Sequence, residues 1–376
     1  MTNRIPAEVF PPGEFLKDEL EARNWTQDEF ATILGRPTAV VNQIISGKRG
    51  ISPETAREIG AALGTSAIFW MNLEAEYRLW RAGPADERIA HEARIRERFP
   101  IRDMQKRGWL QGSKDPDELR GQVLRFFDIE HLDETPRLMH AAKKSGYPED
   151  INGAQLAWLF RVKQLAEVMA VKTYSESSLR NALPELRQML ASVESLHRIP
   201  KLLSDCGVRF VVVEHVPASK IDGVCFWLDG KASSPVIGMS LRLDRIDNFW
   251  FVLRHEIEHV LNRDGRDVAI VDSDMASTLA APSSVAEAEL RADRAAAEFC
   301  VPPIDMEDFI VRHTPIFSAT HILNFSYRMN VHPGLVVGQL QRRTGDYRVF
   351  RKYLVSVRPI IAAVAMTDGY GQQHAL

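Results

Sequence analysis

Two histidines and three carboxylates between residues 255 and 293 have the types and spacing that a catalytic metal site needs. His255 and His259 lie four residues apart in His-Glu-Ile-Glu-His, so on a helix both imidazoles face one side, one turn apart. Two imidazole nitrogens at this spacing can reach one Zn²⁺ ion. Glu256 points toward the open coordination position, where it can take a proton from water that the metal has acidified.

A third ligand is available downstream. Glu289 begins Glu-Leu-Arg-Ala-Asp, 30 residues after His259, and can complete a His-His-Glu set with one open position. Asp293, one turn further on, can accept a hydrogen bond from a ligand histidine and fix its tautomer. Glu258 either points to solvent or pairs with Arg254. The residue that stabilises the transition state is not evident, and the candidates are Tyr174, Arg291, Tyr327 and His332. The simpler alternative is a charged helix face with two surface histidines.

Two helices must carry these residues. The pattern of apolar residues predicts a long helix over 247–261 for the histidines and another over 285–300 for Glu289 and Asp293. Before them, β-branched residues predict three short strands, over 208–213, 224–228 and 236–240. Residues 81–205 are predicted to be mostly helical, with helices over 86–98, 119–127, 153–171 and 177–196. Helices, then a small sheet, then helices favour an α+β domain.

The first 80 residues are predicted to be a run of short helices. They cover residues 14–23, 27–34, 38–45, 53–63 and 68–80. Thr26 with Glu29 three residues later forms the sequence signature of a capping box. Ser52 is predicted to cap the fourth helix, and Gly35 and Gly64 to end the second and fourth.

The composition is that of an ordinary globular protein. The 376 residues are 45% hydrophobic and carry a net charge of −3, which excludes a general attraction to nucleic acid or anionic membranes. Cys206, Cys225 and Cys300 lack metal-like or disulfide-like spacing, so we expect buried thiols in a reducing compartment. No segment has the features of a signal peptide or a membrane span, and the sequence predicts a cytoplasmic protein with no membrane partner.

The histidine helix and its surroundings resemble the ImmA/IrrE family of metallopeptidases. The matching segments are 249–251, 255–259, 289–296 and 299–302, with Gly223 and 235–237 before them. The resemblance covers roughly residues 155–345. It implies Zn²⁺ ligands at His255, His259 and Glu289, Glu256 as the base, and a repressor-type protein as substrate. Ala295 and Glu258 depart from the family pattern, in which phenylalanine and glycine are common.

The amino-terminal region resembles the λ-repressor-like (Xre) helix-turn-helix fold of the HigA antitoxin type. The matching segments are 13–16, 25–27, 34–35, 40–45 and 47–49. In that fold the helix over 38–45 enters the major groove, where Thr38, Asn42 and Gln43 would face base edges and Gln27 and Lys48 would contact phosphates. Residues 1–80 carry 8 Lys and Arg against 11 Asp and Glu. This acidic balance favours the alternative of a helical bundle without a DNA role, unless Arg36, Lys48 and Arg49 cluster on one face.

A second helix-turn-helix-like segment covers residues 325–338, and we expect its helices to cover the catalytic domain rather than bind DNA. The expected organisation is therefore multidomain. An all-α λ-repressor-like domain over 1–82 precedes a helical middle region over 83–150, an α+β zincin-like metallopeptidase domain with a small sheet over 151–345, and a tail over 346–376.

The primary functional hypothesis is a cytoplasmic transcriptional regulator with a zinc-dependent endopeptidase domain that cuts a repressor or another partner. The alternative is a HigA-like antitoxin that represses its own operon and binds a toxin, with the zinc domain as sensor or scaffold. A third possibility is a plain metallopeptidase whose amino terminus recruits substrate. Operator DNA, a repressor or toxin protein, and a second copy of the chain in a homodimer are the expected partners.

Overall fold

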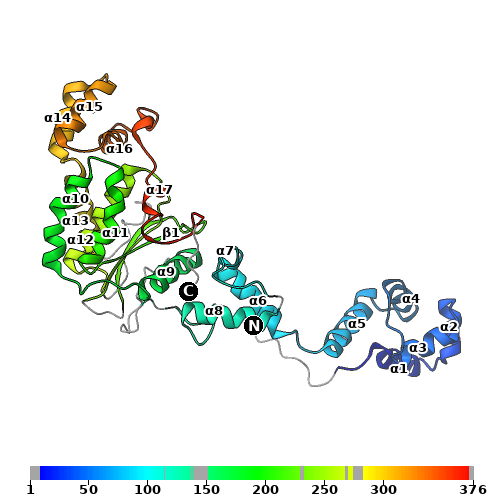
Figure 1. The fold of residues 1–376 in the computed structure, drawn as a ribbon. Coiled ribbons are helices and arrows are strands. Elements are labelled where there is room, and N and C mark those ends of the chain that lie inside the picture. The colour runs from blue at the N-terminus through cyan, green and yellow to red at the C-terminus, as the bar shows by residue number, and fades with distance from the viewer. Residues whose placement is uncertain are drawn as a thin grey trace. The chain divides into compact units, whose positions relative to one another are not determined.

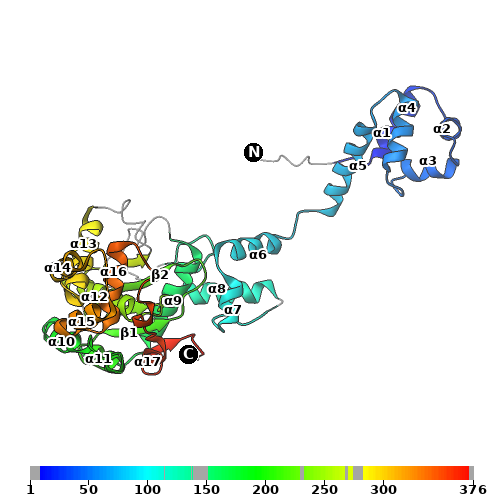
Figure 2. The same cartoon turned by 90° about the horizontal axis from the view of Figure 1, so that it is seen from above.

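The computed structural model describes residues 9–113, 115–136, 138, 151–228, 233–266, 270–273 and 283–371. The chain divides into two compact units, residues 1–89 and 90–376. Figures 1 and 2 show the first unit as a cluster of short helices and the second as helices around a sheet. Within the described residues, no helix combines the length and apolar character that crossing a bilayer requires.

The first unit contains five helices. They are α1 (Pro12–Ala22), α2 (Gln27–Leu34), α3 (Thr38–Ile45), α4 (Pro53–Leu63) and α5 (Ala67–Ala82). The capping box of Thr26 and Glu29 forms at the start of α2, and the Ser52 hydroxyl accepts a hydrogen bond from the Thr55 amide at the start of α4. Gly35 and Gly64, both left-handed, end α2 and α4. Each of these local predictions is confirmed.

The position of α3 depends on a close contact with α1. A Cβ atom on Gly13 would lie 2.2 Å from the Ile44 carbonyl oxygen, so only glycine allows this approach. Val41 and Ile44 of α3 are buried with Leu16, Phe30 and other apolar residues of the unit's core. The opposite face of α3 is left at the surface.

The second unit combines helices with a mixed sheet. Its helices are α6 (Glu87–Arg98, which begins at the end of the first unit), α7 (Ile101–Lys106), α8 (Pro116–Phe127), α9 (Gly153–Glu167), α10 (Glu176–Met189), α11 (Ile199–Asp205), α12 (Ile246–Asn262), α13 (Ser283–Cys300), α14 (Pro303–His313), α15 (Ala319–Met329), α16 (Pro333–Thr344) and α17 (Arg358–Ile361). Short 3₁₀ turns, η1 (Glu194–Arg198) and η4 (Arg351–Tyr353), precede α11 and α17.

The sheet has five described strands in the order β4-β2-β3-β1-β5. They are β1 (Arg209–Val213), β2 (Ile221–Trp227), β3 (Pro235–Met239), β4 (Ile270–Ser273) and β5 (Met366–Asp368). β1 is parallel to β3 and β5, whereas β2 is antiparallel to β3 and β4. The three predicted strands are present, but β4 and β5 were not predicted, because both are short: β4 has two β-branched residues, Ile270 and Val271, and β5 has one, Thr367.

The sheet separates two hydrophobic cores. Phe210 and Val212 of β1 belong to the core shared with α12 and α16, whereas Val211 and Val213 belong to the core shared with α8 and α9. This alternation follows from the two-residue period of a strand. In Figure 1, α9 and α12 lie on opposite sides of the sheet. Helices therefore cover both faces, and Ile95, Phe99 and Phe127 from the expected middle region contribute to the second core.

The second helix-turn-helix-like segment is built into this unit. It covers the last five residues of α15 and the first half of α16, and α16 packs against α12. Leu335, Val336 and Leu340 of α16 are buried. A helix that is buried on this scale cannot enter a DNA groove, so the segment covers the histidine helix, as expected.

Candidate functional site

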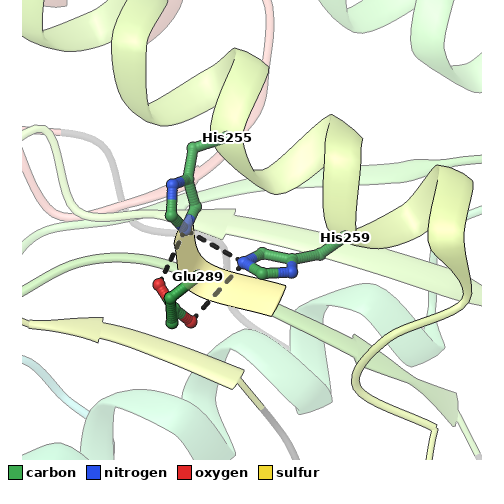
Figure 3. A group of neighbouring side chains, drawn as sticks. All are labelled: His255, His259 and Glu289. Carbon is green, nitrogen blue, oxygen red and sulfur yellow. Dashed lines mark hydrogen bonds and ion pairs between the residues drawn. The ribbon is translucent and has the colours of Figure 1, made fainter. Parts of the chain in front are cut away.

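α12 and α13 bring His255, His259 and Glu289 together, as Figure 3 shows. The two histidine Nε2 atoms are 2.9 Å apart. Glu289 Oε2 lies 3.2 Å from His255 Nε2, and Glu289 Oε1 lies 3.6 Å from His259 Nε2. Both histidines are buried and Glu289 is partly buried. The helical spacing of four residues thus aims both imidazoles at one point, and the next helix supplies a carboxylate there.

The far nitrogen of each imidazole contacts its own carboxylate. Asp293 Oδ1 lies 3.0 Å from His255 Nδ1, and Asp264 Oδ2 lies 3.1 Å from His259 Nδ1. A carboxylate accepts, so each Nδ1 donates a proton and each Nε2 is left with a lone pair. Two lone pairs and the Glu289 carboxylate therefore converge, and this arrangement attracts a cation.

The chemistry and spacing of these three groups fit a zinc ion. Two imidazoles and one carboxylate are the ligand set of many catalytic zinc sites. Ligand atoms about 2.0–2.2 Å from a tetrahedral Zn²⁺ lie roughly 3.3–3.6 Å from one another. The separations of 2.9, 3.2 and 3.6 Å are at or slightly below this range. A second trio, Glu130, His131 and Glu134, is fully exposed, and exposed acidic groups are common without a metal.

Glu256, the predicted base, is fully buried on the sheet side of α12. Its carboxylate lies against Gly223 of β2, where an added Cβ would come within 2.3 Å of Glu256 Oε1 and 2.8 Å of Val252 Cγ1. Gly223 lies where the register between β2 and β4 shifts. The glycine therefore makes room for the carboxylate beside the histidines.

Asp264 is a site residue that the sequence analysis missed. Its Oδ2 atom contacts both His259 Nδ1 and Arg291 Nη2, the latter at 2.7 Å. Burial raises the pKa of Asp264, but the hydrogen bonds with His259 and Arg291 outweigh it and keep the pKa below its usual value. The signal in the sequence is the Asp264-Gly265 pair directly after the histidine helix, a composition typical of a tight turn.

The four candidates for stabilising the transition state have different surroundings. Arg291 pairs with Asp264. The Tyr174 hydroxyl donates to the Val260 carbonyl at 3.4 Å, and burial raises the pKa of Tyr174 to about 12. Tyr327 is 89% exposed on α15. His332 Nδ1 accepts a hydrogen bond from the Gly334 amide at the start of α16, and burial lowers the pKa of His332. Of these four, Arg291 is the one that shares a partner, Asp264, with His259.

Glu258, the unusual residue inside the motif, pairs with Arg254 at 2.7 Å. The Asn262 side chain also donates to Glu258 at 2.9 Å. Glu258 is thus engaged along α12 and is not part of the converging set. The three thiols of Cys206, Cys225 and Cys300 are free and buried, as expected.

The predicted DNA-contacting residues lie along α3 and at its ends. Asn42, Gln43 and Lys48 are exposed, whereas Thr38 at the start of α3 and Gln27 at the start of α2 are partly exposed. The Gln43 carbonyl accepts hydrogen bonds from the amides of Lys48 and Arg49, at 2.9 and 3.0 Å. This turn keeps the two cationic residues next to the end of α3.

The positive charge near α3 differs from the predicted cluster. Arg36 pairs with Glu58 through two hydrogen bonds, at 2.5 and 2.9 Å, so its charge is already neutralised. Lys48 and Arg49 form no ion pair among the described residues. With Arg78 and Arg81 of α5 they line a hollow of about 240 Å³. Arg78 is paired with Glu74 at 2.6 Å, so the local cationic surface comes from Lys48 and Arg49 at the end of α3 and from Arg81 of α5.

Comparisons with known proteins match the first unit. Residues 16–70 match the helix-turn-helix family model. The uncharacterized HTH-type transcriptional regulator YddM of Escherichia coli is 27% identical over 71 residues, 19% of this chain and 76% of that protein. Virulence-associated protein A' of Dichelobacter nodosus is 34% identical over 85 residues, 22% of this chain and 71% of that protein.

Solved structures match the same region. The Pseudomonas aeruginosa antitoxin HigA, solved with the higBA promoter, is 39% identical with a TM-score of 0.20, and the match covers 20% of this chain and 83% of that one. An addiction module antidote protein of the HigA family from Coxiella burnetii is 33% identical, again with a TM-score of 0.20, and the match covers 20% and 83%.

Proposed function

Because this chain belongs, through residues 16–70, to the helix-turn-helix family, we propose that it is a DNA-binding regulator whose second unit is a zinc-dependent endopeptidase. The substrate is a repressor or another protein partner. The observation that carries the peptidase is the convergence of two imidazole lone pairs and one carboxylate, with each imidazole also bonded to a carboxylate behind it.

His255, His259 and Glu289 would hold the zinc ion and leave one position open. When bound, Zn²⁺ supplies Lewis acidity, which polarises the scissile carbonyl and lowers the pKa of water. Glu256 then takes a proton from the attacking water at its carboxylate and passes it to the nitrogen of the departing amine. Burial of Glu256 beside Gly223 fixes the carboxylate in one position and keeps bulk water away from it.

The first unit would bring this chemistry to an operator. The exposed side chains of Asn42 and Gln43 would read base edges from α3, Gln suiting adenine, and Thr38 would lie at the helix start. Gln27 and Lys48 would contact phosphates on either side. A homodimer would place two copies of α3 on the two half-sites of a palindrome.

The decisive experiment compares the wild-type protein with Glu256→Gln. Zinc content is measured alongside cleavage of candidate repressors from the same cell. We expect the variant to retain zinc and lose cleavage, because the amide cannot accept a proton. If Glu256→Gln changed neither proteolysis nor any cellular output, the enzymatic proposal would be abandoned.

The metal itself is tested separately. We expect one bound zinc per chain, lost in His259→Ala and retained in His131→Ala, which removes a histidine from the exposed trio. Equal zinc content in both variants would contradict the proposed ligand set.

The alternative is a HigA-like antitoxin that represses its own operon, binds a toxin and uses the zinc unit as sensor or scaffold. The HigA-type residues in segments 13–16, 40–45 and 47–49 favour it. Both proposals require operator binding. They differ at Glu256, because a sensor needs the ligands but not a base. Toxin binding that survives Glu256→Gln, with no cleavage by the wild type, would favour the antitoxin.

A further inference from the structure

The turn after α12 is built around Asp264. The Asp264 amide donates to the His259 carbonyl at 2.9 Å, and the Trp227 indole N–H donates to the Asp264 carbonyl at 2.8 Å. Arg263 and Gly265, on either side, have positive φ angles of 59° and 75°. A Cβ on Gly265 would lie 2.6 Å from the Cys225 carbonyl oxygen, so the turn sits tightly on β2. The backbone of Asp264 is therefore fixed by both α12 and β2.

The Asp264 side chain joins the two helices that carry the converging ligands. Its Oδ2 atom contacts His259 of α12 at 3.1 Å and Arg291 of α13 at 2.7 Å. Glu289 lies on the same helix as Arg291, two residues earlier. One carboxylate oxygen thus ties the second histidine to the helix that supplies the third ligand.

The two carboxylates behind the histidines are not equivalent. The Asp264 side chain is 19% exposed, whereas the Asp293 side chain is 41% exposed. Hydrogen bonds that are better shielded from water constrain their partners more strongly. In addition, only Asp264 has its main chain bonded to a separate strand, through Trp227. The support for His259 is therefore more rigid than the support for His255.

We propose that Asp264, oriented by Arg291 and Trp227, is the main positioning residue of the metal site. Asp264 sets the tautomer and ring orientation of His259 and connects α12 to α13 around the metal. This inference rests on the proposed zinc site. Losing such an outer partner typically weakens metal binding by about 10–100-fold. We expect a loss in this range for Asp264→Ala and a smaller loss for Asp293→Ala.

The test measures zinc affinity of the full-length protein by competition with a chromogenic chelator. Asp308→Ala is the matched control, since Asp308 forms an exposed pair with Arg312 on α14. Asp264→Asn keeps an oxygen that can accept from His259 Nδ1 but loses the charge that Arg291 contacts, so its affinity should lie between wild type and Asp264→Ala. Arg291→Gln, at an exposed position, should lower affinity several-fold in a folded protein.

Cobalt substitution gives a second readout. The visible absorption of bound Co²⁺ reports coordination geometry, so Asp264→Ala should change the spectrum and Asp308→Ala should not. Thermal unfolding without metal separates a folding defect from a binding defect; if Asp264→Ala does not fold, Asp264→Asn and Arg291→Gln decide the question. If Asp264→Asn and Arg291→Gln both had the zinc affinity and the cobalt spectrum of the wild type, the inference would be overturned. If His259→Ala also binds zinc normally, it is the metal site itself that is wrong.

Discussion

Gly223 on β2 and Glu256 on α12 are in direct contact, and a methyl group at position 223 would approach Glu256 Oε1 to 2.3 Å. The backbone of β2 at Gly223 thereby limits where the buried Glu256 carboxylate of α12 can lie. This relationship makes a residue without a side chain part of the proposed catalytic arrangement.

Gly223→Ala should displace the Glu256 carboxylate without removing a metal ligand. A shift of about 1 Å can lower turnover by about 100-fold. We expect a loss of this order in the cleavage of whichever repressor the wild type cuts and Glu256→Gln does not. Zinc content should be unchanged. Gly112→Ala is the matched control, because a Cβ there meets no atom within 4 Å. Full activity in Gly223→Ala would mean that Glu256 can shift without consequence.

If α3 binds the operator, substitutions there should separately lower operator affinity and the salt dependence of binding. Gln43→Ala combined with Lys48→Ala should abolish binding to an operator selected by the wild-type protein. Lys48→Ala alone should reduce the slope of log affinity against log salt by about 1, because one phosphate contact is lost. Lys17→Ala removes the same charge from α1, where Lys17 faces Glu21 at 3.7 Å, and should leave the slope unchanged. Unchanged gel shifts in the double variant would refute the role of α3.

A buried ion pair should make the second unit sensitive to the loss of either partner alone. Asp368 of β5 pairs with Arg161 of α9 and accepts a hydrogen bond from the Trp109 indole at 3.0 Å. The Asp368 side chain is only 2% exposed and the Arg161 side chain 9%. Breaking such a pair costs about 3–5 kcal/mol, since a buried charge loses its main partner.

Urea unfolding of Asp368→Ala measures this cost. Asp346→Ala is the control, as its partner Arg348 is 90% exposed, and the free energy of unfolding should barely change. The double change Arg161→Met with Asp368→Leu should recover much of the loss, because neither charge remains. Equal stability of the two single aspartate variants would show that the buried pair contributes little.

His332 should make the second unit less stable in mild acid. Burial is the largest cause of its lowered pKa and outweighs the opposing effect of Glu194. The unfolded chain therefore binds a proton more readily than the folded one, so stability is lost as the pH falls below the ordinary value of 6.5. Protonation also removes the lone pair that caps α16.

The comparison is thermal unfolding at pH 7.5 and pH 5.5 in the presence of a chelator, which eliminates effects of metal release. His332→Asn keeps a capping oxygen but does not titrate, so its melting temperature should fall less between the two pH values. An identical fall in both proteins would assign the acid sensitivity to other groups, such as His215, whose pKa burial also lowers.

The sequence predicted those features that depend on local patterns. The bounds of α3, the capping box at Thr26 and the helix carrying His255 and His259 follow from periodicity and capping residues within a few positions. Periodicity placed Glu289 on a following helix, and the chemistry of a His-His-Glu ligand set, not the periodicity, suggested that it meets the histidines. Such patterns need no knowledge of distant contacts.

The parts that were missed depend on distant partners. Met366–Asp368 has little intrinsic preference for a strand and becomes β5 because it pairs with β1, about 155 residues earlier. Asp264 reaches His259 from a turn in which Arg263 is left-handed and which Trp227 of β2 holds by a hydrogen bond. Neither contact leaves a periodic trace in the sequence.

Because β1 pairs with β5, this edge of the sheet can form only after residues 366–368 have been synthesised. The ribosome makes the helix-turn-helix unit first, and that unit is closed by local contacts, so it can fold on the nascent chain. The metal-site residues emerge next, and β5 follows Glu289 by roughly 80 residues, or about 4–15 s of translation. A nascent chain therefore carries the helix-turn-helix unit and the residues of the proposed metal site before β5 has been made.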